Sequence, residues 1–256
     1  MRKQWLVVLD FDGFMLNSYE IIRQTMLSFG LDPGDEERFR NRRKFLKYLG
    51  GGKEVLGNLV RLPLPSTKRL RRRLTECYRE SARLYPAFGD LLNRLIEHPK
   101  VHVGVVSRNF ALDPGDTLRT VMYRSGVDEA DLDFVIPLPV GVRKGEVLAG
   151  MNSGRFQRAI LGGDEIGDYR CGTNADYDCV IASYGFDTRR RLLKKGEVPA
   201  NQIVDTPDEA TEAVLRLLAE DQVGSARSLK FDGTTALRLP MGARNPANAA
   251  ELLAQE

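Results

Sequence analysis

The stretch WLVVLDFDGFMLNS, residues 5–18, runs five apolar residues directly into two aspartates that one phenylalanine separates. An unbroken apolar run such as 5–9 is typical of a strand that is covered on both faces of a sheet. Asp10 and Asp12 follow it, and like charges this close repel unless a cation or a shared proton intervenes. Gly13 then lets the backbone turn sharply and approach a ligand. The stretch therefore predicts a buried strand that ends in a candidate site for a cation.

Short apolar runs recur along the chain and alternate with helical patterns. We expect further strands at 101–106, 134–136, 159–161, 179–182 and 203–204, and helices at 90–97, 117–125 and 208–220. Thr206 and Pro207 suit the N-cap and the first position of the last helix. This alternation predicts an α/β fold with a three-layer, Rossmann-like core around a parallel sheet.

Polar residues stand where several of the expected strands end. Ser107 and Asp164 each follow a strand, as Asp10 does, Asp168 lies four residues further on, and Lys144 lies in VRKGEVL. Ligands in such sheets bind beyond the carboxyl ends of the strands. Carboxylates suit Mg²⁺, while a hydroxyl and an ammonium group suit phosphoryl oxygens. Taken singly, these residues also fit a helix cap, a solvent charge or loop acids, but their shared position favours a site.

Residues 19–85 break the pattern, since they contain no convincing strand. Apolar residues recur with helical spacing at 21–29, 39–49 and 70–84. This spacing predicts an all-helical insertion, a cap domain, after the first strand. From 37 to 85 the chain has fifteen Lys or Arg against four Glu, including the run 68–73. The excess is either a solvated helix face or a surface that attracts an anionic substrate. The few aromatic residues match no nucleic-acid module, which disfavours nucleic acid as a partner.

The composition is that of an ordinary folded protein, with 256 residues, 42% hydrophobic and 29% charged residues and a net charge of +3. Three irregularly spaced cysteines form neither a disulfide framework nor a zinc motif, which favours a reducing compartment. The N-terminal apolar run is too short for a signal peptide and no stretch is long enough to cross a bilayer. We therefore expect a cytoplasmic protein that contacts no membrane. Residues 222–256 are expected to form an extension, with a hairpin at 228–239 followed by a short helix.

Four segments together resemble the motifs of the haloacid dehalogenase-like (HAD) hydrolase superfamily, especially its phosphoglycolate-phosphatase-like branch with a helical cap. They are DFDGFMLNS, VVSRN, Lys144 in RKGEVL, and GGDEIGD, and the resemblance covers roughly residues 5–220. It implies a HAD-like core at 1–18 and 86–221 and a helical cap at 19–85. The activity that it implies is a magnesium-dependent phosphatase acting on a small phosphorylated metabolite.

The resemblance also implies a role for each motif residue. Asp10 would be the nucleophile and form an aspartyl-phosphate intermediate. Asp12 would protonate the leaving oxygen and then deprotonate the water that hydrolyses this intermediate. Ser107 and Lys144 would hold the phosphoryl group. The Mg²⁺ ligands would be Asp10, the backbone carbonyl of Asp12, Asp164, and Asp168 either directly or through water.

Substrate contacts are expected beside these motifs. Arg108 and Asn109 adjoin the serine, and Lys53 follows three glycines in the cap. The glycines at 50–52 form either a substrate-specificity loop or a plain turn between helices. Together with the basic cap, Lys53 favours a substrate that carries a second anionic group.

The chain departs from the family pattern at a few positions. Phe14 and Met15 stand where Thr-Leu is common, Asn17 stands where an acid is frequent, and Gly145 stands where proline often follows the lysine. None of these changes removes a catalytic group, but Phe14 and Met15 can reshape the pocket mouth. Asp12 argues against dehalogenation, because the dehalogenases of the superfamily lack that acid and need no metal.

Two other functions stay open at this point. A sugar phosphomutase shares Asp10 and Asp12 and differs in how its cap excludes water. A catalytically idle protein of the same fold would instead bind a phosphorylated ligand or a partner. The sequence names neither the substrate nor an oligomeric state.

Overall fold

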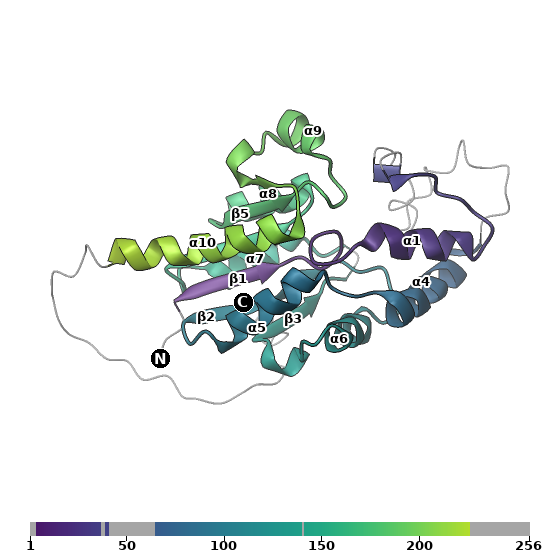
Figure 1. Ribbon diagram of the computed structural model, residues 1–256, viewed down its shortest axis with the longest axis horizontal. Helices are drawn as coiled ribbons and strands as arrows, with labels where there is room; N and C mark the ends of the chain where they lie inside the picture. Colours follow the sequence, from purple (N-terminus) through teal and green to yellow (C-terminus); the bar gives the residue numbers. More distant parts are fainter. Residues whose placement is uncertain (1–3, 37–38, 41–64, 140, 226–256) are drawn as a thin grey trace.

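A parallel sheet of six strands lies at the centre of the computed structural model, which describes residues 4–36, 39–40, 65–139 and 141–225 (Figure 1). The strand order is β3-β2-β1-β4-β5-β6. The strands are β1 (Trp5–Leu9), β2 (Val101–Ser107), β3 (Phe134–Pro137), β4 (Arg158–Gly163), β5 (Asp178–Ala182) and β6 (Ile203–Val204). Each expected strand is present. The strand that precedes the paired aspartates is central, with Leu9 opposite Val105 of β2 and Gly162 of β4.

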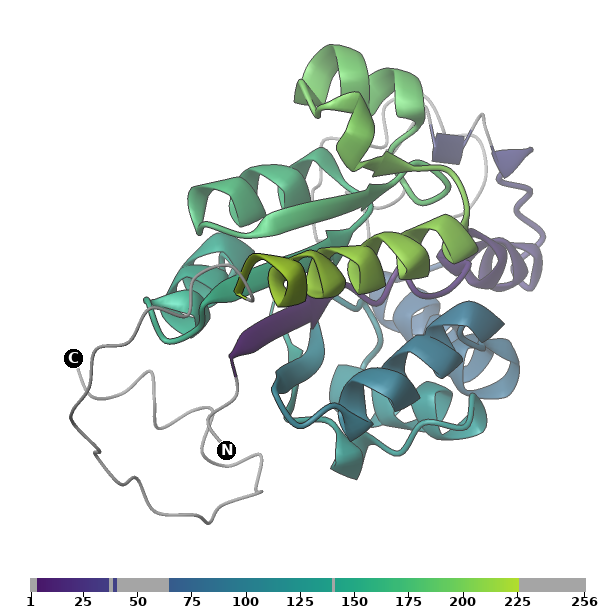
Figure 2. The same ribbon diagram turned by 60° about the vertical axis from the view of Figure 1, so that its left-hand side comes forward.

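Helices cover both faces of this sheet, which confirms the three-layer architecture (Figure 2). One layer contains α5 (Pro86–Glu97), α6 (Pro114–Arg124) and α10 (Pro207–Ser225), and the other contains α7 (Lys144–Asn152) and α8 (Ile166–Asn174). Side chains of β1 alternate between the layers. Val7 and Leu9 belong to the first hydrophobic core, and Leu6 and Val8 belong to the second. The unbroken apolar run thus reflects burial on both faces.

The sequence predicted three of these helices and missed two. α5 and α10 contain the expected segments, and α6 ends one residue before the expected limit of 125. α10 begins as predicted, with Thr206 Oγ1 accepting the N–H of Glu209 over 3.2 Å. α7 and α8 were not expected. Each has nine residues including two glycines, which are poor helix formers, and α7 buries only Lys144 and Leu148. A helix this short with so few buried positions gives no clear amphipathic pattern.

Two further helices, α1 (Ser18–Leu27) and α4 (Thr67–Ser81), pack against each other beyond the carboxyl ends of the strands (Figure 1). We call them the cap helices. The side chains of Asn17 and Ser66 cap them, by accepting the N–H groups of Glu20 and Arg69. They are the helices expected at 21–29 and 70–84. Most of the helix expected at 39–49, the glycines at 50–52 and Lys53 lie outside the described residues, and the expected domain limits stay predictions.

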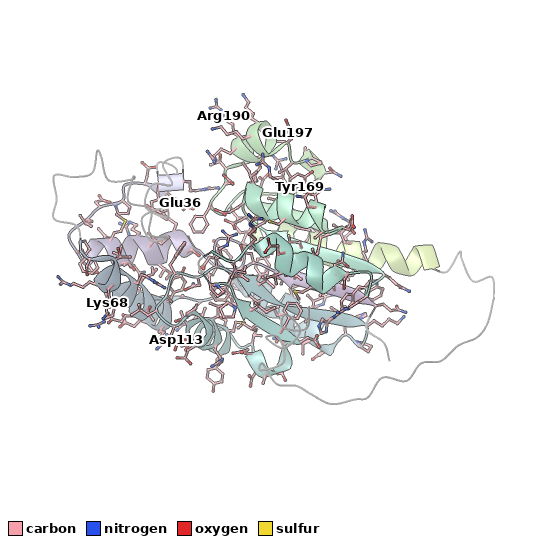
Figure 3. The ribbon with its side chains drawn as sticks, turned by 180° about the vertical axis from the view of Figure 1, so that it is seen from behind. Glu36, Lys68, Asp113, Tyr169, Arg190 and Glu197 are labelled. Atoms are coloured by element: carbon pink, nitrogen blue, oxygen red, sulfur yellow. The ribbon has the colours of Figure 1, made fainter. Side chains whose placement is uncertain are left out.

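The remaining described elements are short turns: η2 (Glu129–Asp131), α9 (Arg189–Arg191), η3 (Leu192–Gly196) and η4 (Ala200–Gln202). In the view from behind, Tyr169 marks α8, and Arg190 marks α9 at the top of the molecule (Figure 3). α10 runs on to Ser225, past the core limit expected at 221. The hairpin predicted at 228–239 and the helix after it lie outside the described residues. Among the helices that are described, none is both long and apolar enough for a bilayer crossing.

The basic run at the start of α4 has a structural use. Lys68 is exposed (Figure 3). Arg71, however, donates to the backbone carbonyls of Phe110 and Ala111 over 2.8 and 3.0 Å. Arg73 pairs with Glu76 on the next turn, at 3.0 Å. Part of the positive charge therefore holds α4 in place, and attraction of an anion by the rest stays a prediction.

Candidate active site

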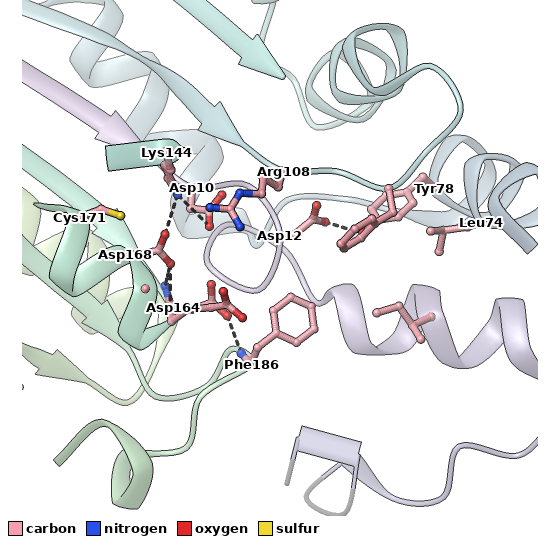
Figure 4. A pocket seen from close by; sticks show the side chains of 14 residues that line it. Asp10, Asp12, Leu74, Tyr78, Arg108, Lys144, Asp164, Asp168, Cys171 and Phe186 are labelled. Atoms are coloured by element: carbon pink, nitrogen blue, oxygen red, sulfur yellow. Dashed lines mark hydrogen bonds and ion pairs between the residues drawn. The ribbon is translucent and has the colours of Figure 1, made fainter. Parts of the chain in front are cut away.

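A pocket of about 430 Å³ lies where the carboxyl ends of the strands face the cap helices (Figure 4). Its charged lining includes six residues that the sequence singled out: Asp10, Asp12, Arg108, Lys144, Asp164 and Asp168. Apolar side chains also line the cavity. Ile22 and Leu74 come from the cap helices, and Phe110 and Phe186 come from loops of the core. The fold therefore gathers the distant acidic and basic motif residues around one cavity.

Lys144, the first residue of α7, lies between two carboxylates (Figure 4). Its Nζ is 3.1 Å from Oδ2 of Asp10 and 2.8 Å from Oδ1 of Asp168. Burial opposes the positive charge, but the two carboxylates outweigh it and raise the pKa of Lys144. The lysine is therefore a fixed cation beside Asp10. Burial raises the pKa of Asp10, and the charge of Lys144 opposes that rise.

Asp164 follows β4 and is fully buried. Its Oδ2 accepts the N–H of Phe186 over 2.5 Å, but its Oδ1 has no hydrogen-bond partner in the described part of the chain. Burial raises the pKa of Asp164 well above its ordinary value, and the charges of Glu165, Asp168 and Asp10 add to that rise. A buried carboxylate oxygen without a partner is costly, and a bound cation would remove the cost.

The acidic group fits a magnesium ion. Asp10, Asp164 and Asp168 each offer a carboxylate oxygen, and these three atoms lie within 4.8 Å of one another. Asp168 has fewer free acceptor positions for a metal ion than Asp164. Its Oδ1 accepts from Lys144, and its Oδ2 accepts the N–H groups of Asp164 and Glu165. The Asp12 carboxylate is not part of this group. The sequence assigned only its backbone carbonyl to the metal.

Gly13 explains how the chain passes so close to the acidic group. Its φ is +80°, in the left-handed region that favours glycine. A Cβ at this position would lie 2.2 Å from Oδ2 of Asp164 and 2.8 Å from its Cγ. Any side chain here would displace the carboxylate. The sequence argument from backbone freedom is therefore confirmed, and the close approach to Asp164 is an additional reason for glycine.

Asp12 is held by three hydrogen bonds from three separate parts of the chain. Its Oδ1 accepts from the hydroxyls of Ser18 (2.8 Å) and Tyr78 (2.5 Å), and its Oδ2 accepts from the amide of Asn109 (2.9 Å). Burial raises the pKa of Asp12 to about 6, although the bonds from Tyr78 and Ser18 favour the charged form. A carboxyl group with this pKa can both release and accept a proton near neutral pH.

The serine motif places its three residues differently. Ser107 is fully buried at the end of β2, and its hydroxyl has no hydrogen-bond partner within the described residues. The Ser107 hydroxyl nevertheless favours the charged form of Asp10 and so lowers its pKa, which means that the two side chains lie close to each other. Arg108 is exposed and lines the pocket. Asn109 is buried and directed at Asp12, so its visible use is to hold that carboxyl group.

Sequence reasoning missed three residues that support the site. Ser18 and Tyr78 hold Asp12, and Asp187 accepts the N–H of Ile166 at the start of α8 (2.9 Å) and pairs with Arg191 (2.6 Å). Ser18 stands at the end of the first motif and could have been noticed there. Nothing in the sequence around Tyr78 distinguishes it from a core residue of an amphipathic helix.

The expectation that Phe14 and Met15 reshape the pocket mouth is wrong. Both side chains have 0% exposure, and neither lines the pocket. The ring of Phe14 packs edge-on against Phe88 of α5, with 5.0 Å between the ring centroids. These residues fill the core under the first motif, which explains why apolar side chains follow the two aspartates. Lys53, the expected substrate contact in the cap, lies outside the described residues.

Comparisons with solved structures match most of the chain. A haloacid dehalogenase-like hydrolase from Streptococcus pneumoniae is 16% identical with a TM-score of 0.57, and the match covers 87% of this chain and 100% of that one. CbbY from Rhodobacter sphaeroides, solved with phosphate, is 18% identical with a TM-score of 0.55, over 80% and 95% of the two chains. A protein from Thermotoga maritima described as a beta-phosphoglucomutase is 15% identical with a TM-score of 0.57, over 83% and 99%.

The chain has the haloacid dehalogenase-like fold. The resemblance seen in the four motifs is thus confirmed for the fold, and one further match from Lactobacillus delbrueckii is described as a phosphoglycolate phosphatase. No family model and no curated protein matches the chain. Because the identities are low, the activity has to be argued from the site itself.

Proposed function

We propose that this HAD-fold protein is a magnesium-dependent phosphatase that hydrolyses a small phosphate monoester through an aspartyl-phosphate intermediate. One arrangement carries the proposal. Lys144 and Asp164 flank Asp10, and Asp12, with a pKa of about 6, lies two residues further along the same loop. A nucleophile beside a fixed cation and a proton donor near neutral pH are the parts that phosphoryl transfer through an enzyme carboxylate needs.

The reaction has two steps. A carboxylate oxygen of Asp10 attacks phosphorus, the bond from phosphorus to the ester oxygen breaks, and Asp12 gives its proton to that leaving oxygen. Water then attacks the aspartyl phosphate, Asp12 takes a proton from the water, and inorganic phosphate leaves with the Asp10 carboxylate restored. Lys144 and the unpartnered hydroxyl of Ser107 hold the phosphoryl oxygens during both steps.

Asp10 and Asp164 would hold the magnesium ion through carboxylate oxygens, with Asp168 bound directly or through water and with the carbonyl of Asp12. When bound, the ion neutralises charge on the phosphoryl group and on the facing carboxylates. Asp168 has a second use, because its bond to Lys144 keeps the ammonium group directed at Asp10.

A small phosphorylated ligand suits the pocket. Its volume of about 430 Å³ is toward the small end of ligand pockets. A structural match, CbbY, has been solved with phosphate and, in another crystal, with xylulose-(1,5)bisphosphate. Arg108 is an exposed cation at the pocket and is suited to a second anionic group. Lys53 is proposed for the same task.

A sugar phosphomutase remains the second candidate. The match described as a beta-phosphoglucomutase and the hydrolase from Streptococcus pneumoniae have the same TM-score, 0.57. The two reactions share the first half and differ in whether water or a sugar hydroxyl accepts the phosphoryl group. Release of inorganic phosphate from a panel of sugar phosphates identifies the phosphatase. Conversion of one sugar phosphate into its isomer without phosphate release identifies the mutase.

Turnover of p-nitrophenyl phosphate tests the proposal most directly. The wild-type protein should release nitrophenolate with Mg²⁺ and not with a chelator, and Asp10→Asn should abolish turnover while leaving the fold intact. The amide keeps the shape of Asp10 but cannot attack. Near-wild-type turnover by pure Asp10→Asn would refute the nucleophile, and wild type that only binds phosphate without hydrolysis would indicate a binding protein.

A further inference from the structure

Tyr78, on the cap helix α4, contacts the candidate catalytic machinery directly. Its hydroxyl donates to Oδ1 of Asp12 over 2.5 Å, across 66 residues of sequence (Figure 4). The tyrosine is buried, with 3% of its surface exposed. Burial and the Asp12 charge raise the pKa of Tyr78 well above its ordinary value, so it stays a hydrogen-bond donor. Nothing in the proposed reaction yet uses this contact.

The hydrogen bonds around Asp12 can be counted. A carboxylate has about four acceptor positions, two on each oxygen. Ser18 and Tyr78 occupy those of Oδ1, and Asn109 occupies one on Oδ2. One position on Oδ2 is left. When this carboxyl group carries a proton, Oδ1 therefore serves as the carbonyl oxygen, and the free position on Oδ2 is the one left for the hydroxyl hydrogen.

The position of Tyr78 is fixed by the rest of α4. Arg71, Thr75 and Tyr78 lie on one face of the helix, at the i, i+4 and i+7 positions. Arg71 donates to the carbonyls of Phe110 and Ala111, and Thr75 Oγ1 accepts the N–H of Leu112 over 2.9 Å. These bonds attach α4 to residues 110–112, which directly follow Asn109, and Asn109 also holds Asp12. The helix and the loop are therefore bonded to each other, and each holds this carboxyl group by one hydrogen bond.

We propose that Tyr78 is a positioning residue that occupies Oδ1 of Asp12, so that the catalytic proton resides on Oδ2. The inference rests on the proposed function, since it concerns the proton that Asp12 delivers to the leaving oxygen. Without the Tyr78 hydroxyl, a position on Oδ1 becomes free. The proton can then reside on the wrong oxygen, and the carboxyl group can rotate about its Cβ–Cγ bond.

The loss should depend on the leaving group. An ester whose leaving oxygen is strongly basic needs a proton as its bond to phosphorus breaks, whereas nitrophenolate leaves without one. Phenyl phosphate and p-nitrophenyl phosphate share a ring and differ in the basicity of the leaving oxygen. The value of kcat/KM reports the steps up to departure of this oxygen, before the second use of Asp12.

The test compares kcat/KM for both esters, with Mg²⁺, in wild type, Tyr78→Phe and Tyr177→Phe. Tyr177 is the matched control, since it is also buried and its hydroxyl donates to a backbone carbonyl, that of Leu148, over 3.0 Å. We expect Tyr78→Phe to lower kcat/KM about tenfold or more for phenyl phosphate, within the roughly 10²–10⁴-fold that general acid catalysis supplies. For p-nitrophenyl phosphate we expect kcat/KM to fall by less than about threefold, roughly the effect of losing a weak contact. Tyr177→Phe should leave kcat/KM unchanged for both esters.

A second comparison tests whether Tyr78 acts through Asp12. In an Asp12→Asn background, Tyr78→Phe should have no further effect on phenyl phosphate turnover, because residues that act as a unit are not additive. Equal losses for the two esters, no loss at all, or a full loss in the Asp12→Asn background would each overturn the inference. A wild type inactive toward both esters would refute the proposed function, and the inference with it. Thermal melts verify folding, and Tyr78→Met replaces Tyr78→Phe if the latter does not fold.

Discussion

Nζ of Lys144 lies 2.8 Å from Oδ1 of Asp168, although the two residues are 24 apart in the sequence and belong to different helices. The contact joins the start of α7 to the first turn of α8. It also places the lysine 3.1 Å from Asp10, the proposed nucleophile. The lysine is buried and paired with a carboxylate on each side, which holds its charge beside Asp10.

Removing this cation should destabilise the protein as well as inactivate it. Lys144→Gln leaves the carboxylates of Asp10 and Asp168 buried and facing each other, and breaking a buried ion pair from one side costs about 3–5 kcal/mol. We expect a lower free energy of unfolding in urea and no measurable turnover. The stability loss should shrink when Mg²⁺ is added, since the ion supplies positive charge to the same carboxylates. Lys194→Gln, at an exposed position of η3, is the control that should change neither quantity.

Magnesium should stabilise the wild-type protein through Asp164. A ligand that binds only the folded state stabilises it by about 2.7 kcal/mol at a hundredfold excess over its Kd. Asp164→Asn keeps an acceptor for the N–H of Phe186 but removes the buried charge. We therefore expect this variant to melt higher than wild type in a chelator and to lose the rise in Tm with Mg²⁺. An unchanged magnesium response would place the ion elsewhere. Glu212→Gln, on the exposed side of α10, should respond as wild type does.

Two glycines allow the space beside Asp164 to be tested separately from backbone strain. Gly13 and Gly30 have φ of +80° and +71°, so an alanine at either position is strained by roughly 1–2 kcal/mol. A Cβ at Gly30 would meet nothing within 4 Å, whereas one at Gly13 would lie 2.2 Å from Oδ2 of Asp164. Gly13→Ala should therefore lose the magnesium response and the activity, while Gly30→Ala should lose only some stability. Retention of a normal magnesium response by Gly13→Ala would contradict this geometry.

The sheet and the main acidic groups could be predicted because they follow from local patterns. The apolar runs mark strands buried on two faces, and Asp10 and Asp164 stand where strands end, so the parallel topology brings them together. Phe14 and Met15 show that comparing residue types with a family motif does not reveal where the side chains lie. Their departure from the common Thr-Leu pointed to the pocket mouth, but both side chains are buried in the core below the motif.

The partners of Asp12 could not be predicted in the same way. Asn109 was expected to bind substrate, but its amide is directed at Asp12. Tyr78 lies on α4 among the buried residues Leu74, Thr75 and Cys77, and its spacing is that of any residue facing a core. Only the packing of α4 against the core, which depends on contacts such as those of Arg71, brings its hydroxyl to the carboxylate. Long-range packing of this kind leaves no local pattern.

The pH dependence of stability provides a test of Asp12 that does not depend on turnover. Burial raises the pKa of Asp12 from its ordinary 3.8 to about 6 in the folded chain. Between these values the folded state keeps the proton that the unfolded state has released, so folding loses stability as the pH rises. The contribution is fully present below pH 3.8 and is lost once the pH passes about 6. A difference of about two pKa units corresponds to about 3 kcal/mol.

The measurement is the free energy of unfolding of wild type and Asp12→Asn, both with a chelator, from pH 4 to pH 7. All other titrating residues are common to the two proteins, so the difference isolates Asp12. From pH 4 to pH 7 the free energy of unfolding of Asp12→Asn should rise relative to that of wild type by about 2 kcal/mol, whatever the constant cost of its altered hydrogen bonds. A difference that stays flat, or that moves in favour of wild type as the pH rises, would mean that Asp12 is already ionised at pH 4 in the folded protein. It could then not deliver a proton to the leaving oxygen near neutral pH.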